Sequence, residues 1–488
     1  ADRLGLAGRA SGVVELRAPN RRQTAELDLD VAGFRGFDAA VDALGIEGTV
    51  EDATGTPDGA ITLTLEGARH PQGSVERGRV AAEFTDATAP QGVVEADYRL
   101  EGLAAAGQAS VARLEGTARV PDPAGEPAAR IDAVLSRIAA EAAEARIGTL
   151  RIGADVTALT ASPALDGTVE VEDAEAAGFA IARARLDADL ADLAGSPGGR
   201  VEAVVGPISG DAASVEEARL AADLEDLLGA GRVEADVTVR GIEAGGARVA
   251  GAEATASLAG VTASPSGTVE ATLRDVSGPA AISRVDLSAD VANAVDAPAG
   301  TLSVRTSPIG VGALRVASLT LDAEAATAEG RTRLDASLAS AGVAGDGLST
   351  GAIRLTARLA DALGADPGLT ARLGLASVEA GGLALTEPTL NAEGPLSRLA
   401  IALDADGKFD RKSLTVEMRA TADAVSATPG ATIRTLELTL DEARAGLDRP
   451  LAIRVDGPAT RIEGLDLGLP GARVSGDAAL HGNGASGA

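Results

Sequence analysis

The sequence feature that most constrains the fold is an internal repeat with a period of about 33 positions. A glycine opens one alternating segment after another, and Gly167, Gly199, Gly231, Gly267 and Gly300 follow one another at nearly this spacing. A fixed period of this size indicates stacked structural repeats rather than separate globular domains. We therefore expect one continuous repeat array over residues 1–480, followed by a small, polar and flexible tail over residues 481–488.

Each repeat has the alternation of β-strands. The segments ITLTL (61–65), VEADVTVR (233–240) and LELTL (436–440) carry an apolar residue at every second position. Because successive side chains of a strand point to opposite faces, the pattern predicts one apolar and one polar face. Two other segments leave room for helix. Residues 36–48 are compatible with a short helix, and the helix-favouring composition of 127–146 makes it compatible with either helix or strand.

These patterns predict an all-β protein. We expect an elongated repeat β-solenoid or a curled, taco-shaped sheet with an apolar inner groove and at most a few short helices, so that the sheet covers its own apolar face. The pattern leaves open whether that face is an open groove or the dry core of a closed solenoid. The residues that the alternation assigns to the groove lining are Ile61, Leu63, Leu65, Val169, Val171, Val233, Val237, Val239, Leu302, Val304, Leu319, Leu321, Ile353, Leu355, Leu436, Leu438 and Leu440.

Charge and composition exclude several classes of function. A net charge of −29 repels the phosphates of nucleic acids, which excludes a non-specific nucleic-acid binder. The absence of cysteine excludes disulfides, thiolate metal sites and thiol nucleophiles, and with only His70 and His481 a histidine-rich metal site is excluded too. The sequence contains no apolar run long enough for a transmembrane helix, so we expect that this chain does not itself span a membrane as a helix.

Three short motifs match functional patterns but lack the required context. Residues 347–351 (GLSTG) fit the nucleophile-elbow pattern, yet a strand-like segment follows instead of a helix. Residues 482–487 (GNGASG) fit a dinucleotide-binding pattern without a following helix. Asp404 and Asp406 begin like a calcium loop, but its twelfth position is Thr415 and not glutamate. We therefore expect no catalytic residue, no cofactor and no metal site, and predict that the protein is not an enzyme.

Tandem units of the form Asp-Leu, short amphipathic stretch, glycine and alternating strand occur at 28–51 and 223–239, with a weaker copy at 358–375. These units resemble the TamB family, the inner-membrane subunit of the translocation and assembly module, within the wider AsmA-like group of bridge-like lipid-transfer proteins. The resemblance covers nearly all of the chain. It rests on repeat pattern and composition, because the family has no catalytic motif to compare.

The resemblance implies a long curled β-sheet in the periplasm of a Gram-negative bacterium, anchored in the inner membrane by an N-terminal helix. It also implies a non-enzymatic role in which phospholipid acyl chains pass along the groove between inner and outer membrane, in support of outer-membrane biogenesis and protein assembly. The implied protein partner is an outer-membrane barrel of the BamA type. The anchor helix and the barrel-engaging C-terminal domain are not recognisable here, as expected of an internal segment.

Two other interpretations fit the same alternation. One is a structural β-solenoid or stalk with a dry core. The other is a chaperone-like scaffold that pairs the β-strands of client proteins at its sheet edge.

Overall fold

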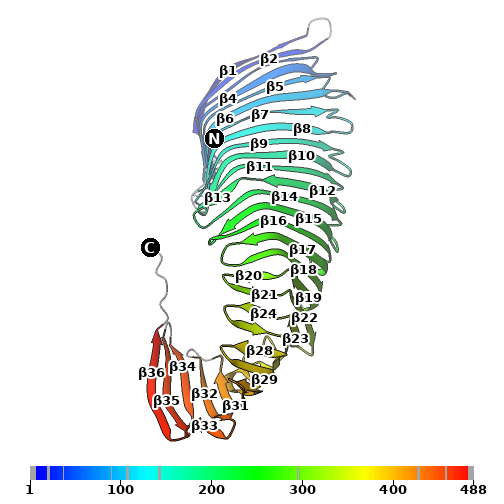
Figure 1. Ribbon diagram of the computed structural model, residues 1–488. Coiled ribbons are helices and arrows are strands. Elements are labelled where there is room, and N and C mark those ends of the chain that lie inside the picture. The colour runs from blue at the N-terminus through cyan, green and yellow to red at the C-terminus, as the bar shows by residue number, and fades with distance from the viewer. Residues whose placement is uncertain are drawn as a thin grey trace. The chain divides into compact units, whose positions relative to one another are not determined.

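The computed structural model describes residues 7–18, 22–36, 38–89, 91–105, 109–140, 144–293, 295, 297–425, 429–456 and 459–481 (Figure 1). Within these residues the predicted all-β fold class is confirmed, because antiparallel strands make up nearly all of the regular structure and one 3-10 turn, η3 (Leu396–Arg398), is the only helical element. The chain divides into two compact units, unit 1 over Ala1–Gly245 and unit 2 over Gly246–Ala488.

Unit 1 is an antiparallel meander in which each strand pairs with its neighbours in the sequence. Its strands are β1 (Ala7–Arg17), β2 (Thr24–Gly36), β3 (Ala39–Glu51), β4 (Asp58–His70), β5 (Gly73–Thr85), β6 (Val93–Ala105), β7 (Ala109–Pro121), β8 (Ala129–Ala140), β9 (Ala145–Thr157), β10 (Ala164–Ala176), β11 (Phe179–Ala191), β12 (Gly198–Val205), β13 (Ile208–Gly210), β14 (Ala213–Glu225) and β15 (Arg232–Ala244). Strands β12 and β13 together take the place of one long strand, since both pair with β11 and β14. The full-length strands are nearly equal in length, and a pair of strands with its two turns accounts for the repeat.

A line of irregular pairing, which we call the crease, crosses unit 1 near one end of the strands. In β4 and β5, for example, Glu66 pairs with Arg77 and Ala68 with Val75, so Gly67 and Glu76 are both skipped. Each strand therefore has one extra, unpaired residue at this line, and the register is the same on both sides of it. The same skip recurs at Gly33 and Asp42, Gly102 and Ala112, Arg137 and Gly148, Asp173 and Ala182, and Glu216 and Gly241.

The crease keeps apolar side chains on one face of the sheet. In every second strand the extra residue has a positive φ, for example +61° at Gly67 and +52° at Arg137. Because the alternation slips by one position there, apolar residues three apart, such as Leu65 and Ala68, lie on the same face.

The opposite edge of unit 1 is a stack of similar loops, seen along one side of the strands in Figure 1. The loops are residues 52–57, 86–92, 122–128, 158–163, 192–197 and 226–231, and all but 158–163 begin with an aspartate whose φ lies between +48° and +50°. In the loop at Asp192, the backbone N–H of Ser196 donates to the Asp192 carboxylate at 2.9 Å. Neighbouring loops are joined by backbone bonds such as Leu193 N–H to Pro163 C=O at 2.8 Å.

Unit 2 is also antiparallel, but several of its strands are broken into a long and a short piece. Its strands are β16 (Ala247–Ala259), β17 (Ser266–Ser277), β18 (Ala281–Ala292), β19 (Ala299–Thr306), β20 (Ile309–Val311), β21 (Leu314–Val316), β22 (Leu319–Ala328), β23 (Arg331–Ser340), β24 (Val343–Gly345), β25 (Leu348–Thr350), β26 (Ile353–Ala360), β27 (Gly368–Leu375), β28 (Ser377–Ala380), β29 (Leu383–Pro395), β30 (Leu399–Phe409), β31 (Lys412–Asp423), β32 (Gly430–Leu440), β33 (Ala443–Leu447), β34 (Leu451–Asp456), β35 (Ala459–Leu469) and β36 (Ala472–His481). From β19 to β28 the short pieces pair with one another and the long pieces do the same.

The two segments that the sequence left open to a helix both form β-strands. The segment 36–48, considered for a short helix, lies mostly in β3, where Ile46 pairs with both Leu29 and Leu63. The ambiguous segment 127–146 forms β8 and the start of β9. In both places cross-strand pairing outweighs a helix propensity that spans less than about 1 kcal/mol per residue. Of the expected tail, His481 ends β36 and the remaining residues lie outside the described part.

Candidate functional site

The register aligns apolar side chains into rows that cross the whole of unit 1. One row passes through β2 to β15, excluding the short β13. Each of its members is the cross-strand partner of the next member on the adjacent strand. Its members are Leu29, Ile46, Leu63, Val80, Tyr98, Gly116, Ala133, Ile152, Val169, Leu186, Ala203, Leu220 and Val237. With neighbouring strands about 4.8 Å apart, the row is on the order of 60 Å long.

Parallel rows widen this apolar face. The row on one side joins Leu27 to Gly48 and Ile61, and the row on the other joins Val31 to Leu44 and Leu65. Beyond the crease a further row runs through Leu103, Val111, Ile138, Ile147, Ala174, Ile181, Ile208, Val215 and Ile242. At the paired positions of these rows, from β2 to β15, the described residues are Gly, Ala, Val, Leu, Ile and Phe, with Tyr98 as the one hydroxyl.

The opposite face of the same strands is polar. On each strand, the residue next to the member of the Leu29 row points to the other face, and these residues form a polar row of their own. In it Asp28 pairs with Glu47, Glu47 with Thr62, and Thr168 with Asp187. The Thr168 hydroxyl donates to Asp187 at 2.7 Å, and Arg185 bonds the same carboxylate at 2.8 Å. The Arg185 guanidinium and the Thr168 hydroxyl hold the pKa of Asp187 below its usual value. Such cross-strand pairs fix the register that keeps the apolar rows aligned.

Unit 2 has an apolar face of the same kind. One of its rows joins Ala254, Ala271, Leu287, Val304, Leu321, Leu338, Leu355, Leu373, Leu390, Leu403, Met418 and Leu436. Where strands break, this face carries hydroxyls. Leu319 and Ile353 both pair with Ser340, a buried residue whose hydroxyl accepts from the Gly342 N–H at 3.3 Å.

The structure places every sequence-predicted lining residue on these apolar faces. In unit 1 they are Ile61, Leu63 and Leu65 of β4, Val169 and Val171 of β10, and Val233, Val237 and Val239 of β15. In unit 2 they are Leu302 and Val304 of β19, Leu319 and Leu321 of β22, Ile353 and Leu355 of β26, and Leu436, Leu438 and Leu440 of β32. All seventeen are half-buried. The apolar rows to which they belong contain many further residues.

The sequence patterns missed the row beyond the crease. Residues such as Phe34, Ile138 and Ile242 follow the preceding inward residue by three positions instead of two, so strict alternation assigns them to the polar face. The i, i+3 spacing of apolar residues at the end of an alternating segment is the signal that finds them.

Within the residues that the structure describes, the apolar faces are only partly buried. Among the described residues, the only buried alanines and larger hydrophobic side chains are Ala133, Ala222, Leu399, Ala405, Ala420 and Leu451, and no large side chain is fully buried. A dry core holds its large side chains almost free of solvent contact. By contrast Leu186 and Leu220, toward the β15 end of the Leu29 row, are 38% and 36% exposed. The described residues of the face are therefore partly exposed to solvent, unlike the large side chains of a dry core.

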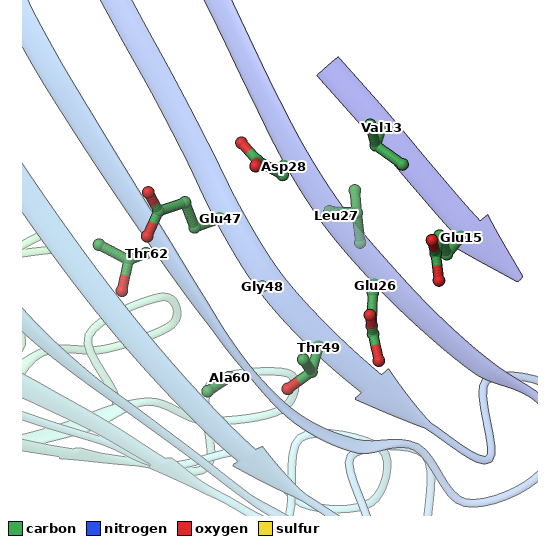
Figure 2. A pocket seen from close by; sticks show the side chains of 10 residues that line it. All are labelled: Val13, Glu15, Glu26, Leu27, Asp28, Glu47, Gly48, Thr49, Ala60 and Thr62. Atoms are coloured by element: carbon green, nitrogen blue, oxygen red, sulfur yellow. The ribbon is translucent and has the colours of Figure 1, made fainter.

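One hollow in each unit lies on the polar face of the sheet. A hollow of about 520 Å³ in unit 1 is lined by Glu15, Glu26, Asp28, Glu47, Thr49 and Thr62 among others, and Figure 2 shows these side chains rising from adjacent strands. A hollow of about 700 Å³ in unit 2 is lined by residues such as Asp322, Asp335 and Arg358.

The rejected motifs occupy ordinary strand positions. Ser349 lies in the three-residue strand β25 opposite Glu379, beside a hollow of about 480 Å³ whose described lining includes no histidine. Asp404 and Asp406 lie within β30, where Asp404 accepts from Arg419 at 2.8 Å and Asp406 from Thr415 at 3.0 Å. His70 ends β4, and its Nδ1 accepts from the Gln72 N–H at 3.2 Å.

The most buried carboxylate among the described residues, Asp466, is held by arginine side chains. Asp466 in β35 is 6% exposed and accepts two bonds from Arg473, at 2.5 and 2.6 Å. The Arg473 guanidinium lowers the pKa of Asp466, and Arg449 adds a third contact at 3.3 Å. In the described part of the chain, no group of three or more His, Asp or Glu side chains has an arrangement that would hold a metal ion.

Fold and site together define the protein as a repeat protein of antiparallel β-sheet with one uncovered apolar face and one acidic face. Comparison with protein-family models, with curated proteins and with solved structures finds no match. Within the residues that the structure describes, no helix has the length and apolarity needed to cross a lipid bilayer.

Proposed function

We propose that the protein is a non-enzymatic groove protein that conducts phospholipid, with the acyl chains lying on the apolar faces of its sheet. The observation that carries the proposal is the uncovered apolar face of unit 1, whose rows run across the strands without a charged side chain. A structural stalk would gain stability by closing this face, and a client-strand scaffold would act through its sheet edge. Neither function needs an apolar surface that stays open to solvent.

The energetics suit transport better than storage. Removing a 16-carbon chain from water altogether is favourable by about 12 kcal/mol, at about 0.8 kcal/mol per CH₂. A chain that lies on an open face is dehydrated on one side only, which retains roughly half of that gain. Small aliphatic side chains offer no shaped pocket in which a lipid would stop. The bound chain therefore gains enough to leave water and can still slide from one position to the next.

The cellular setting belongs to the same proposal and rests on the repeat pattern of the sequence. We place the protein in the periplasm of a Gram-negative bacterium, where it carries lipid between inner and outer membrane and supports outer-membrane biogenesis and protein assembly. The full-length protein would be anchored in the inner membrane and work with an outer-membrane barrel of the BamA type. The acidic polar face keeps such a surface soluble.

The test is a belt of charge across the apolar face. The variant Val233→Asp, Val237→Asp, Val239→Asp places three carboxylates across β15, each on a different apolar row. The charge-matched control Val204→Asp, Ala221→Asp, Thr238→Asp puts three carboxylates on the polar face of β12, β14 and β15. Both proteins are purified from a bacterial periplasm, and retained phospholipid is counted by mass spectrometry under mild conditions.

We expect several phospholipids per chain in the wild type and in the control. The belt variant should retain fewer lipids and lose transfer of fluorescent phospholipid between vesicles, while its circular dichroism stays that of a β-sheet, because half-exposed positions tolerate charge. A folded, lipid-free wild type would refute the proposal. Unfolding of the belt variant but not of the control would instead indicate a dry core, and single Leu438→Asp in β32 repeats that comparison in unit 2.

A further inference from the structure

The charged residues nearest to the apolar face of unit 1 lie at its two edges. Between β2 and β15 the paired positions of the face carry no charge, so the polar headgroup of a bound lipid has to project past an edge or away from the sheet. The charges that such a headgroup meets first are those of the loops that join the strands. Their sign therefore biases which headgroups are accepted.

The loop between β1 and β2 contains Arg22, but the later loops carry acidic residues without basic ones. From β3 onward, the described residues of the six loops in the stacked edge include six carboxylates and neither lysine nor arginine. The carboxylates are Asp52, Asp86, Asp122, Glu126, Asp192 and Asp226. The short turns of the opposite edge add Asp38, Glu144 and Asp211, again with no lysine or arginine among their described residues. On the strands themselves, by contrast, arginines neutralise many of the acids, as Arg77 and Arg99 do around Glu101.

The loop carboxylates act on a headgroup by their charge, not as ligands. Asp192 is already held by the Ser196 N–H at 2.9 Å and the Ser162 hydroxyl at 2.8 Å. Asp226 is held in the same way by the Ala230 N–H at 3.2 Å and the Ser196 hydroxyl at 2.8 Å. Successive loops of this edge are two strands, or about 10 Å, apart. That distance is close to the Debye length at physiological salt, so a headgroup at the edge senses two or three of these charges.

We infer that the apolar face of unit 1 prefers phospholipids with a zwitterionic, amine-bearing headgroup over anionic ones, because its edges repel net negative charge. This inference rests on the proposed function. Two or three unit charges at about 10 Å in water give a preference of about threefold to fivefold at low salt, and screening in 0.5 M salt should remove most of it.

The experiment offers the full chain vesicles of phosphatidylcholine that contain equal amounts of phosphatidylethanolamine and phosphatidylglycerol. Bound lipids are extracted and quantified at 50 mM and at 500 mM NaCl. The edge variant Asp52→Asn, Asp86→Asn, Asp192→Asn, Asp226→Asn removes four loop charges, and asparagine oxygens can still accept the turn hydrogen bonds. The matched control Asp30→Asn, Asp97→Asn, Asp189→Asn, Asp236→Asn removes four charges from exposed positions on the polar face.

We expect the wild type and the control to hold about threefold to fivefold more phosphatidylethanolamine than phosphatidylglycerol at low salt. The edge variant should fall to less than twofold. Equal uptake of the two lipids by the wild type, or an edge variant with an unchanged ratio, overturns the inference and leaves the proposed function standing. A chain that takes up neither lipid overturns the proposed function itself.

Discussion

At the scale of single residues, the loop aspartates show how the chain holds its turns. The Ser196 N–H and the Ser162 hydroxyl lower the pKa of Asp192, with Gly195 N–H adding a weaker bond. Because the pKa in the folded state lies below the unfolded value of about 3.9, this contribution is fully present above that pH and is lost as the pH falls through the lowered pKa. The loop is therefore stabilised by an ionised carboxylate at neutral pH.

We predict that Asp192→Ala speeds amide hydrogen exchange in residues 192–197 roughly tenfold at pH 7, through loss of these bonds and of a residue type that tolerates positive φ. Asp192→Asn should stay closer to the wild type. As the pH falls from about 4 through the lowered pKa of Asp192, the wild type should lose protection in this loop, after correction for intrinsic exchange, whereas the asparagine variant should not. Identical pH profiles for the two proteins would show that the carboxylate contributes nothing.

At the scale of elements, the crease decides which side chains reach the apolar face. Gly33 in β2 has a φ of +61° and open space where a Cβ would stand. Deleting Gly33 removes the extra residue from β2 while β3 keeps its own at Asp42, so the pairs Phe34–Val41 and Arg35–Ala40 can no longer form without distortion. We expect hydrogen exchange over residues 34–41 to become about 30-fold faster, equivalent to about 2 kcal/mol. Gly33→Asn is the control and should change exchange little, since asparagine tolerates a left-handed backbone.

Alternation in the sequence was sufficient to predict the strands and their apolar face, but it could not predict the crease. The extra residue with positive φ is Gly67 in β4, Arg137 in β8 and Asp173 in β10, so no single residue type marks it. Nor could alternation decide the segment 127–146, where the choice between helix and strand depends on pairing with β7 and β9. Both features depend on partners in the adjacent strands, which the local pattern does not contain.

At the scale of the whole molecule, pairing is local, and this predicts how stability is distributed. Every pairing in unit 1 joins strands that are consecutive or separated by one short piece, such as β12 with β14 across β13. In such a protein, stability is approximately a sum over repeats and their nearest neighbours. The openness of the apolar face could not be predicted from sequence because an alternating pattern is the same for a dry core and for a bare surface.

The same locality gives a prediction that separates a continuous surface from a single binding pocket. A lipid-binding face has a capacity that grows with its area, whereas a pocket holds a fixed number. We expect residues 1–245 and residues 246–488, expressed separately, each to keep the circular dichroism of a β-sheet and to retain about half of the phospholipids that the intact chain retains. Mass spectrometry under mild conditions counts them. If one folded fragment kept the full number and the other none, lipid would bind at one place, and the continuous face would not be the conduit.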